Sequence, residues 1–438
     1  MIRNFFIFVF ALSLWGCQSN KPDKKNNAIG SSVIFEVLQQ STEMMVHDVS
    51  NPPLASRFYA YTCLGGYTAL SGFDDSVGSF FSHVNAFPEL KSKPGKNADQ
   101  GLSTILAMAE VSSLIQPSGK TMKTWKDQFM DSCRKEGWKE EVINASNEYA
   151  IVVAAAIREY AQADGYKKLS NYPRYAPQKT DSTWYATPPG YFPAVEPYFS
   201  RIRPFLLDTT QLDQFGIPSP ISYSKHPGSA FMESAQQVYQ ADKRKDALQI
   251  AAFWDCNPFA LSENGHLLIG MKKISPGAHW MGISAIACNQ AKTDFRQTMK
   301  IQTILAMGMM DAFWLCWREK YRTDRIRPET AIRKLIDPQW KPFLQTPPFP
   351  EYPSGHSVVS TTAALILTQF FGENFSYTDT VERRYGITDR KFSSFKLAAE
   401  EASISRFYGG IHFKDAIENG QVLGSKAGNY FLKKLRLQ

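Results

Sequence analysis

The stretch "EYPSGHSVVSTTAALILTQFFG" (residues 351–372) combines a turn, a helix start and a long apolar run. Pro353 suits the turn before a helix, and Ser354 is a preferred N-cap residue. A helix N-terminus presents free N–H groups and the positive end of the helix dipole, so it favours anions. One of only seven histidines, His356, stands at this helix start. The stretch therefore predicts a buried helix that is either simply capped or binds an anion beside a histidine.

Helical periodicity recurs along most of the chain, and no run of alternating strand residues or internal repeat interrupts it. Between the helices, residues 168–229 are rich in Pro, Tyr and Ser, and their aromatic side chains predict an ordered loop that wraps the helices. The predicted class is all-α, built of helical bundles. The predicted helices are 31–49, 56–72, 99–115, 119–137, 139–162, two near 229–254, 292–321, 355–372, 393–409 and 414–435.

The composition is that of a globular protein. The chain has 438 residues, of which 43% are hydrophobic and 21% charged, with a formal net charge of +8. No dense Lys/Arg stripe is interleaved with aromatic residues, so no nucleic-acid partner is expected. We predict an N-terminal helical half at 30–180 and a C-terminal domain at 181–438. Two bundles packed together and one fused core both agree with this division.

The first residues, "MIRNFFIFVFALSLWGC", have a short basic start, an apolar run and small residues before Cys17. This order is typical of a secretory signal peptide, expected at 1–16. "LWGC" is similar to a bacterial lipobox, which implies a lipid on Cys17, a polar tether at 17–29 and anchoring to the outer membrane on its periplasmic or surface side. Plain secretion is the alternative. The best later candidate for a membrane span, 303–317, is interrupted by Asp311, so only the lipid anchor is expected to hold the protein at a membrane.

The other five cysteines are Cys63, Cys133, Cys256, Cys288 and Cys316. No pair of them has metal-ligand spacing. Cys288 and Cys316 fall in apolar helical runs and are predicted to be buried. One or two disulfides remain open in an oxidising compartment.

Two basic residues near the end of the long helix are the first part of a candidate site. Lys320 and Arg327 are seven residues apart, so two turns of one helix would project them the same way, and Pro328 would end or kink that helix. Such a pair usually lies on a solvated face. Here the preceding run is apolar, and Trp317 is placed to stack on the lysine stem.

Two further stretches complete the candidate site. Gly355 lets a ligand approach the backbone closely, and His356 titrates near neutrality. In "SRFYGGIHFKD", Arg406 ends a helical run, the glycines at 409–410 break it, and His412 follows. An arginine offers a planar fork to a tetrahedral oxyanion. Together the three stretches predict a pocket for a phosphate-like anion.

The pattern K-x6-RP … PSGH … SR-x5-H resembles the signature shared by vanadium-dependent haloperoxidases and type 2 acid phosphatases, over at least residues 184–420. The resemblance implies a fold like that of the vanadium haloperoxidases and type 2 phosphatidic acid phosphatases. It implies that His412 is the axial ligand of vanadium, that His356 is the acid–base group, and that Trp317 and Phe349 flank the cofactor. The implied ligands of the vanadate oxygens are Lys320, Arg327, Ser354, Gly355 and Arg406.

The sequence departs from the family at one position. The family pattern has Asp four residues after the axial histidine, where this chain has Ala416. Asp415, Glu418 or a backbone carbonyl remains as the group that orients His412.

The resemblance implies two chemistries. In one, vanadate is the cofactor of a haloperoxidase that acts on hydrogen peroxide and a halide, with Lys320 taking part in catalysis. In the other, a secreted acid phosphatase forms a phosphohistidine at His412. The long helical half before the motifs and the absence of a spanning run favour the peroxidase. Iodide, the halide that is easiest to oxidise, is the expected substrate. A non-catalytic lipoprotein that binds an oxyanion or a glycan is a third reading, and the oligomeric state is open.

Overall fold

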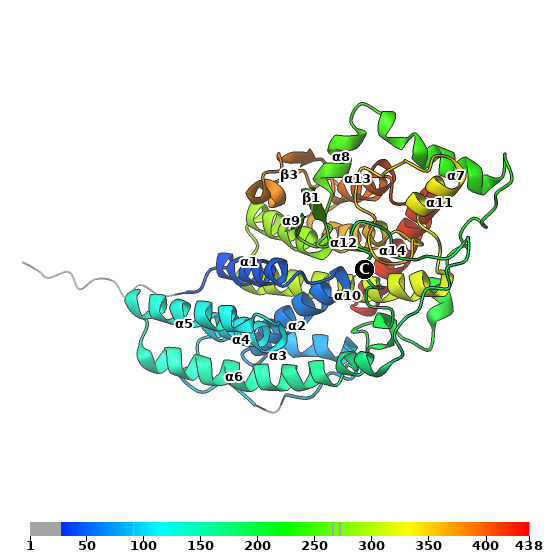
Figure 1. Cartoon of the computed structure of the whole chain (residues 1–438). Helices are drawn as coiled ribbons and strands as arrows, with labels where there is room; N and C mark the ends of the chain where they lie inside the picture. The colour runs from blue at the N-terminus through cyan, green and yellow to red at the C-terminus, as the bar shows by residue number, and fades with distance from the viewer. Residues whose placement is uncertain (1–27, 91, 265–266, 271–272, 438) are drawn as a thin grey trace, which may run out of the picture.

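The regular structure is almost entirely helical, as predicted (Figure 1). The computed structural model describes residues 28–90, 92–264, 267–270 and 273–437. The α-helices are α1 Ser32–His47, α2 Pro52–Ser71, α3 Asp75–Gly78, α4 Gln100–Ile115, α5 Gly119–Lys135, α6 Glu140–Gln162, α7 Ala230–Tyr239, α8 Ala247–Phe253, α9 Pro276–Ala291, α10 Phe295–Thr323, α11 Pro328–Leu335, α12 Gly355–Phe371, α13 Phe395–Tyr408 and α14 Lys414–Lys434.

Short elements fill the connections. The 3₁₀ turns are η1 Ser79–His83, η2 Tyr166–Asn171, η3 Phe199–Arg201, η4 Leu212–Phe215, η5 Ala241–Lys243 and η6 Val381–Tyr385. Two small antiparallel hairpins pair β1 Leu261–Asn264 with β2 Leu267–Gly270, and β3 Tyr377–Asp379 with β4 Arg390–Phe392. The hairpins, α9 and α11 lie outside the predicted elements. α9 has Pro276 at its first position, and Ser275 caps its N-terminus. α11 is too short to show a periodic pattern in the sequence.

α10 is the central helix of the molecule. It packs against α2 on one side and against α12 and α14 on the other, while α2, α4 and α6 form the N-terminal group (Figure 1). Its residues from Ile301 to Trp317 are all buried, as expected for a helix that is surrounded by other helices. One continuous hydrophobic cluster runs from Ile34 to Leu435. Both groups of helices therefore share α10, and the boundary predicted at residue 180 stays a prediction.

Asp311 is a charged residue in the middle of this buried helix. Its carboxylate accepts hydrogen bonds from the backbone N–H groups of Phe205, Leu206 and Leu207, at 2.8, 2.6 and 3.0 Å. These three bonds pin the 168–229 segment to α10. That segment is ordered and buries its aromatic residues Trp184, Phe199 and Phe205, as predicted. None of the helices that the structure describes combines the length and the apolar character of a membrane span.

The prediction that Lys320 and Arg327 share one helix is wrong. α10 ends at Thr323, where Asp324 adopts a left-handed conformation with φ of 46°. Arg327 has extended backbone and precedes Pro328, which is the first residue of α11. The left-handed residue turns the chain back, so the two side chains reach the same region from different elements.

The five cysteines of the described residues are all free and buried. The burial predicted for Cys288 and Cys316 is confirmed, and the disulfides left open by the sequence do not form among these five. Cys17 lies outside the described residues.

Candidate active site

The start of α12 is built as its sequence predicts. The Ser354 hydroxyl accepts the N–H of Ser357 at 3.3 Å and caps the helix. Gly355 and His356 follow in the first turn and line a small pocket. Ser354 itself is fully buried behind this turn. The helix N-terminus therefore faces a cavity, which is the geometry that an anion site needs.

The pocket brings together six of the residues predicted from the sequence. Trp317, Phe349, Gly355, His356, Arg406 and His412 contribute to its wall. The remaining lining residues are Pro52, Cys256, Asn257, Pro258, Phe259, Pro276, Phe313, Pro347 and Ile411. The wall is thus largely apolar, and its polar members are the two histidines, Arg406, Asn257 and Cys256, as is usual for a site that excludes water from a bound group.

Glu351 is the group that orients His412, and sequence reasoning missed it. Its Oε1 lies 2.9 Å from His412 Nδ1 and accepts the N–H of Phe413 at 2.9 Å. Its Oε2 accepts Arg325 Nη1 at 3.2 Å. Burial raises the pKa of Glu351 above its ordinary value, although the positive charge of Arg325 acts to lower it. Since three donors face its two oxygens, we assign it as a carboxylate.

The residues considered for this role lie elsewhere. Asp415 accepts Arg325 Nη1 at 2.7 Å and the N–H of Ile221 at 2.9 Å, and Glu418 is exposed. Asp415 therefore supports Glu351 only through Arg325. Glu351 lies two residues before Pro353 of the PSGH motif, so this acid is part of the sequence stretch that begins the site.

His412 is neutral and presents a lone pair. Burial, together with the charges of Arg327 and Lys320, lowers its pKa well below the ordinary value. Its Nε2 lies 3.2 Å from Arg327 Nη1, which donates, so Nε2 accepts and Nδ1 carries the hydrogen toward Glu351. A neutral imidazole with one nitrogen fixed by a carboxylate is the form that binds a metal centre.

His356 is the second histidine of the pocket. Burial and the charge of Arg406 lower its pKa well below the ordinary value. Its ring hydrogen-bonds the backbone of Trp254, while Nε2 is buried and has no partner among the described residues. An unpaired ring nitrogen that lines a pocket can accept or return a proton.

Two arginines leave donors unpaired at the site. Arg327 donates to the carbonyls of Phe349 and Ile411, both at 2.9 Å, but its Nη2 has no partner among the described residues. Arg406 donates to the carbonyl of Trp254 at 2.8 Å, and its Nε is likewise unpaired. Both side chains are buried. Buried cations with orphaned donors indicate an anionic ligand that would complete them.

Lys320 lies behind the loop that precedes α12 and is not on the pocket wall. Its Nζ donates to the carbonyls of Pro350, Glu351 and Pro353, at 3.0, 3.0 and 2.6 Å. Burial lowers the pKa of Lys320 to about 7, while the three carbonyls favour the ammonium form. Lys320 must release a carbonyl before it can contact a ligand, so its predicted contact with vanadate stays a prediction.

Phe349 and Trp317 pack against the cations. Their rings lie 4.9 Å apart, and Trp317 Nε1 donates to the carbonyl of Val195 at 3.1 Å. Lys320 Nζ lies 5.1 Å from the Phe349 ring centroid, and the Arg327 guanidinium 5.0 Å. The aromatic pair thus holds two cations in a low-dielectric wall, which strengthens their attraction for an anion.

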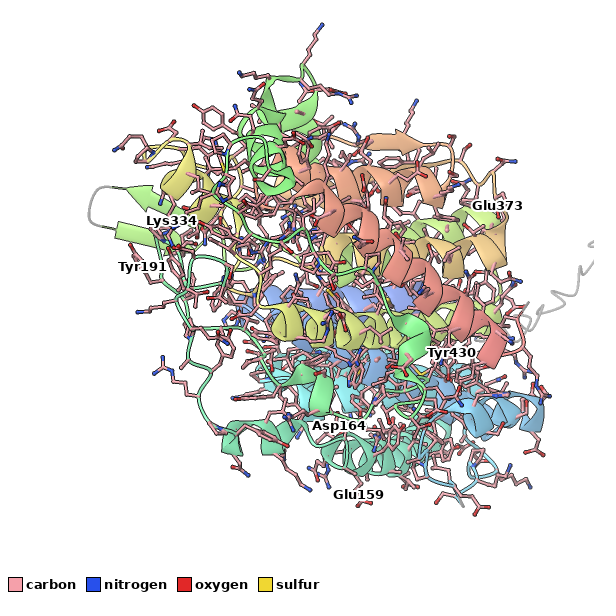
Figure 2. All side chains as sticks on the ribbon, turned by 90° about the vertical axis from the view of Figure 1, so that its right-hand side faces the viewer. Glu159, Asp164, Tyr191, Lys334, Glu373 and Tyr430 are labelled. Atoms are coloured by element: carbon pink, nitrogen blue, oxygen red, sulfur yellow. The ribbon has the colours of Figure 1, made fainter. Side chains whose placement is uncertain are left out.

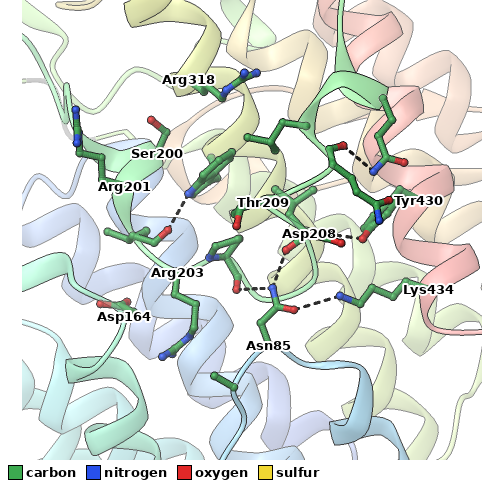
Figure 3. Close-up of a pocket in the computed structure, with 18 of the residues that line it drawn as sticks. Asn85, Asp164, Ser200, Arg201, Arg203, Asp208, Thr209, Arg318, Tyr430 and Lys434 are labelled. Atoms are coloured by element: carbon green, nitrogen blue, oxygen red, sulfur yellow. Dashed lines mark hydrogen bonds between the residues drawn. The ribbon is translucent and has the colours of Figure 1, made fainter.

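A larger, more open cavity of about 1340 Å³ lies apart from this pocket (Figure 3). It is bordered by Asp164, which follows α6, and by Tyr430 of α14, which Figure 2 also labels. Arg203 and Lys434 are among its lining residues. None of the residues predicted from the three motifs lines it, so size alone does not identify the candidate site.

Comparisons with known proteins agree with this geometry. The family "VCPO second helical-bundle domain" matches residues 300–437, which hold all three motifs. A crystal structure of a bacterial vanadium-dependent iodoperoxidase is 38% identical, covers 93% of this chain and 97% of its own, and superposes with a TM-score of 0.87.

A bacterial vanadium-dependent chloroperoxidase in its holo form has the same fold, with a TM-score of 0.63 at 15% identity, over 89% of this chain and 93% of its own. No curated protein sequence matches. With 38% identity over nearly its whole length, and with the motif residues gathered around one pocket, the chain belongs to the vanadium-dependent haloperoxidase family.

Proposed function

We propose that this protein is a vanadium-dependent haloperoxidase that oxidises iodide with hydrogen peroxide. The observation that carries the proposal is the His412–Glu351 pair beside unpaired arginine donors. A neutral, oriented imidazole next to buried cations is suited to a tetrahedral oxyanion with a metal at its centre. The 38% identical relative is itself described as an iodoperoxidase, which supports iodide as the halide.

The donors of the pocket fit vanadate. Arg327 Nη2 and Arg406 Nε would donate to its oxygens, and the first turn of α12 at Gly355 would add backbone N–H groups. His412 Nε2 would exchange its hydrogen bond from Arg327 Nη1 for the vanadium atom. Lys320 and Ser354 remain proposed ligands that lie directly behind the pocket. Bound vanadate would supply a Lewis acid that activates peroxide without a change of oxidation state.

His356 would handle protons. Its Nε2 is unpaired, and the ring is held by the backbone of Trp254 and is neutral, so it can take a proton from peroxide as it binds. The apolar wall of Trp317, Phe313 and Phe349 would exclude water from the reacting atoms. It would also admit iodide, the most weakly hydrated of the common halides.

The test uses protein freed of vanadate and produced from about residue 30. Triiodide formation from iodide and peroxide should require added orthovanadate. Release of p-nitrophenol from p-nitrophenyl phosphate is measured on the same sample without vanadate. Iodide oxidation that depends on vanadate supports the proposal. Phosphate release that vanadate inhibits, without iodide oxidation, would make the protein a phosphatase.

We further propose that the protein is a lipoprotein of the outer membrane, attached through Cys17. The proposal rests on the apolar run and the "LWGC" ending of the first 17 residues. The polar residues after Cys17 would give the catalytic domain a tether. Since hydrogen peroxide and halides are small and diffusible, an enzyme held outside the cytoplasm would act on them where they enter.

A further inference from the structure

A second group of chemically active side chains lies beside the vanadate pocket. Cys256, His279 and Glu382 bring Sγ, Nδ1 and Oε1 within 4.8 Å of one another. They come from three distant segments: the residues after α8, the first turn of α9, and η6. All three are buried, with relative exposures of 2%, 0% and 7%. The proposed function uses none of them.

The distances among the three atoms are those that a bound metal ion requires. Sγ lies 3.5 Å from Nδ1 and 3.7 Å from Oε1, and Nδ1 lies 3.6 Å from Oε1. A tetrahedral zinc ion has bonds of about 2.3 Å to sulfur and about 2.0–2.2 Å to nitrogen or oxygen, which places its ligand atoms roughly 3.3–3.6 Å apart. The Nδ1···Oε1 distance exceeds that of an N–H···O hydrogen bond, which is about 2.7–3.2 Å long. The two sulfur distances also suit weak hydrogen bonds of the Cys256 thiol. The three atoms thus surround a common point, and a metal ion there would replace the hydrogen bonds of the Cys256 thiol.

The remaining nitrogen of His279 is fixed in the way that metal-binding histidines are. Asp379 Oδ2 lies 2.8 Å from Nε2, and Asp379 is itself held by the N–H of Val381 at 3.0 Å. The Trp254 ring stacks on the imidazole at 4.7 Å. A carboxylate on the far nitrogen sets the tautomer and leaves Nδ1 as a ligand.

We propose that Cys256, His279 and Glu382 bind one divalent cation of the zinc class, with Asp379 orienting His279. A thiolate and a carboxylate balance the charge of the cation, and a mixed Cys/His/carboxylate set selects zinc over magnesium or calcium. Three protein ligands leave a fourth position for water. Binding is independent of vanadate.

The cation would fasten the wall of the vanadate pocket. Cys256 also lines that pocket, and the carbonyl of Trp254, two residues earlier, accepts Arg406 Nη1 at 2.8 Å. The same backbone holds the ring of His356. A metal bridge from Cys256 to α9 and η6 would therefore fix the segment that positions two groups of the active site.

The test measures metal content and not activity. Vanadate-free protein is incubated with zinc, dialysed, and analysed by mass spectrometry for zinc per chain. We expect about one zinc ion per chain. Cys256→Ser and Glu382→Gln should lose most of it, and Asp379→Asn should weaken binding by about 10- to 100-fold. Cys288→Ser, which removes a buried cysteine outside the group, is the matched control and should keep full zinc.

Cobalt gives a second readout on the unaltered chain. A thiolate-to-cobalt charge-transfer band should appear in the near ultraviolet, and it should persist in Cys288→Ser. The absence of that band, a zinc content well below one per chain, or full zinc in Cys256→Ser would each overturn the proposal. Because the cobalt spectrum needs no variant, a Cys256→Ser protein that fails to fold does not block the test.

Discussion

Replacing Glu351 by glutamine isolates the charge that orients His412. The side chain keeps its size and one carbonyl oxygen, which can still accept from His412 Nδ1 and from the N–H of Phe413, each 2.9 Å away. A hydrogen bond to a charged group contributes about 1.5–3 kcal/mol, against about 0.5–1.5 for a neutral one. The difference of about 1–2 kcal/mol is about 5- to 30-fold in an equilibrium constant. We therefore expect Glu351→Gln to raise the vanadate dissociation constant by that factor.

The assay titrates orthovanadate into vanadate-free protein and follows iodide oxidation at fixed peroxide, so that half-saturation reports affinity. Asp415→Asn is the matched control, since Asp415 pairs with the same Arg325 nitrogen at 2.7 Å while Glu351 holds the histidine. The control should shift half-saturation by less than the Glu351 variant does. An unchanged Glu351→Gln titration, or a larger shift in Asp415→Asn, would refute the assignment. Melting temperatures of both variants exclude a general loss of structure.

Four further predictions concern single residues. His356→Ala should lower kcat by about 10²–10⁴-fold while vanadate still binds, as measured by turnover at saturating vanadate and by equilibrium dialysis. Phe349→Ala should weaken vanadate binding about threefold to tenfold, because Lys320 and Arg327 each lose contact with a ring about 5 Å away. Equilibrium dialysis measures the vanadate dissociation constant of this variant. Asp311→Ala should lower the free energy of unfolding, measured in urea, by about 3 kcal/mol or more, because three buried N–H groups lose their acceptor. The control, Asp294→Ala, removes one exposed N-cap hydrogen bond and should lower it by markedly less. Cys17→Ser should move the full chain from the membrane fraction to the soluble fraction; an unchanged distribution would contradict the lipid anchor.

Most helices could be predicted because their apolar residues recur at helical spacing. The helices predicted at 139–162 and 355–372 appear as α6 and α12, with ends that differ by a residue or two. α9 is buried on nearly all sides, so its pattern has no polar face to mark the period. The end of α10 depends on Asp324 in a left-handed conformation, which sequence spacing does not reveal.

The sequence motifs predicted the residues that line the candidate site but not the residue that orients His412. The motifs identified Arg327, Arg406 and both histidines, and the pocket brings them together. Glu351 escaped because its link to His412 spans 61 positions. A buried acid in the apolar, proline-rich stretch before PSGH is nevertheless a signal, since such a group needs a partner.

The cluster at Cys256 shows the same limit of local motifs. Its ligands are 23 and 103 positions apart and are of three residue types, so no Cys/His spacing rule finds them. Only the packing of α9 against the segment that carries Asp379 and Glu382 brings them together.

The central claim is that vanadate held at His412 carries the oxidation of iodide. The most direct measurement counts vanadium bound per chain and follows iodide oxidation in the same titration, for the unaltered protein and for His412→Ala. We predict that activity rises in step with bound vanadium and saturates at about one per chain, and that the variant neither binds vanadium tightly nor oxidises iodide. Iodide oxidation that is independent of bound vanadium, or that survives in His412→Ala, would contradict the account.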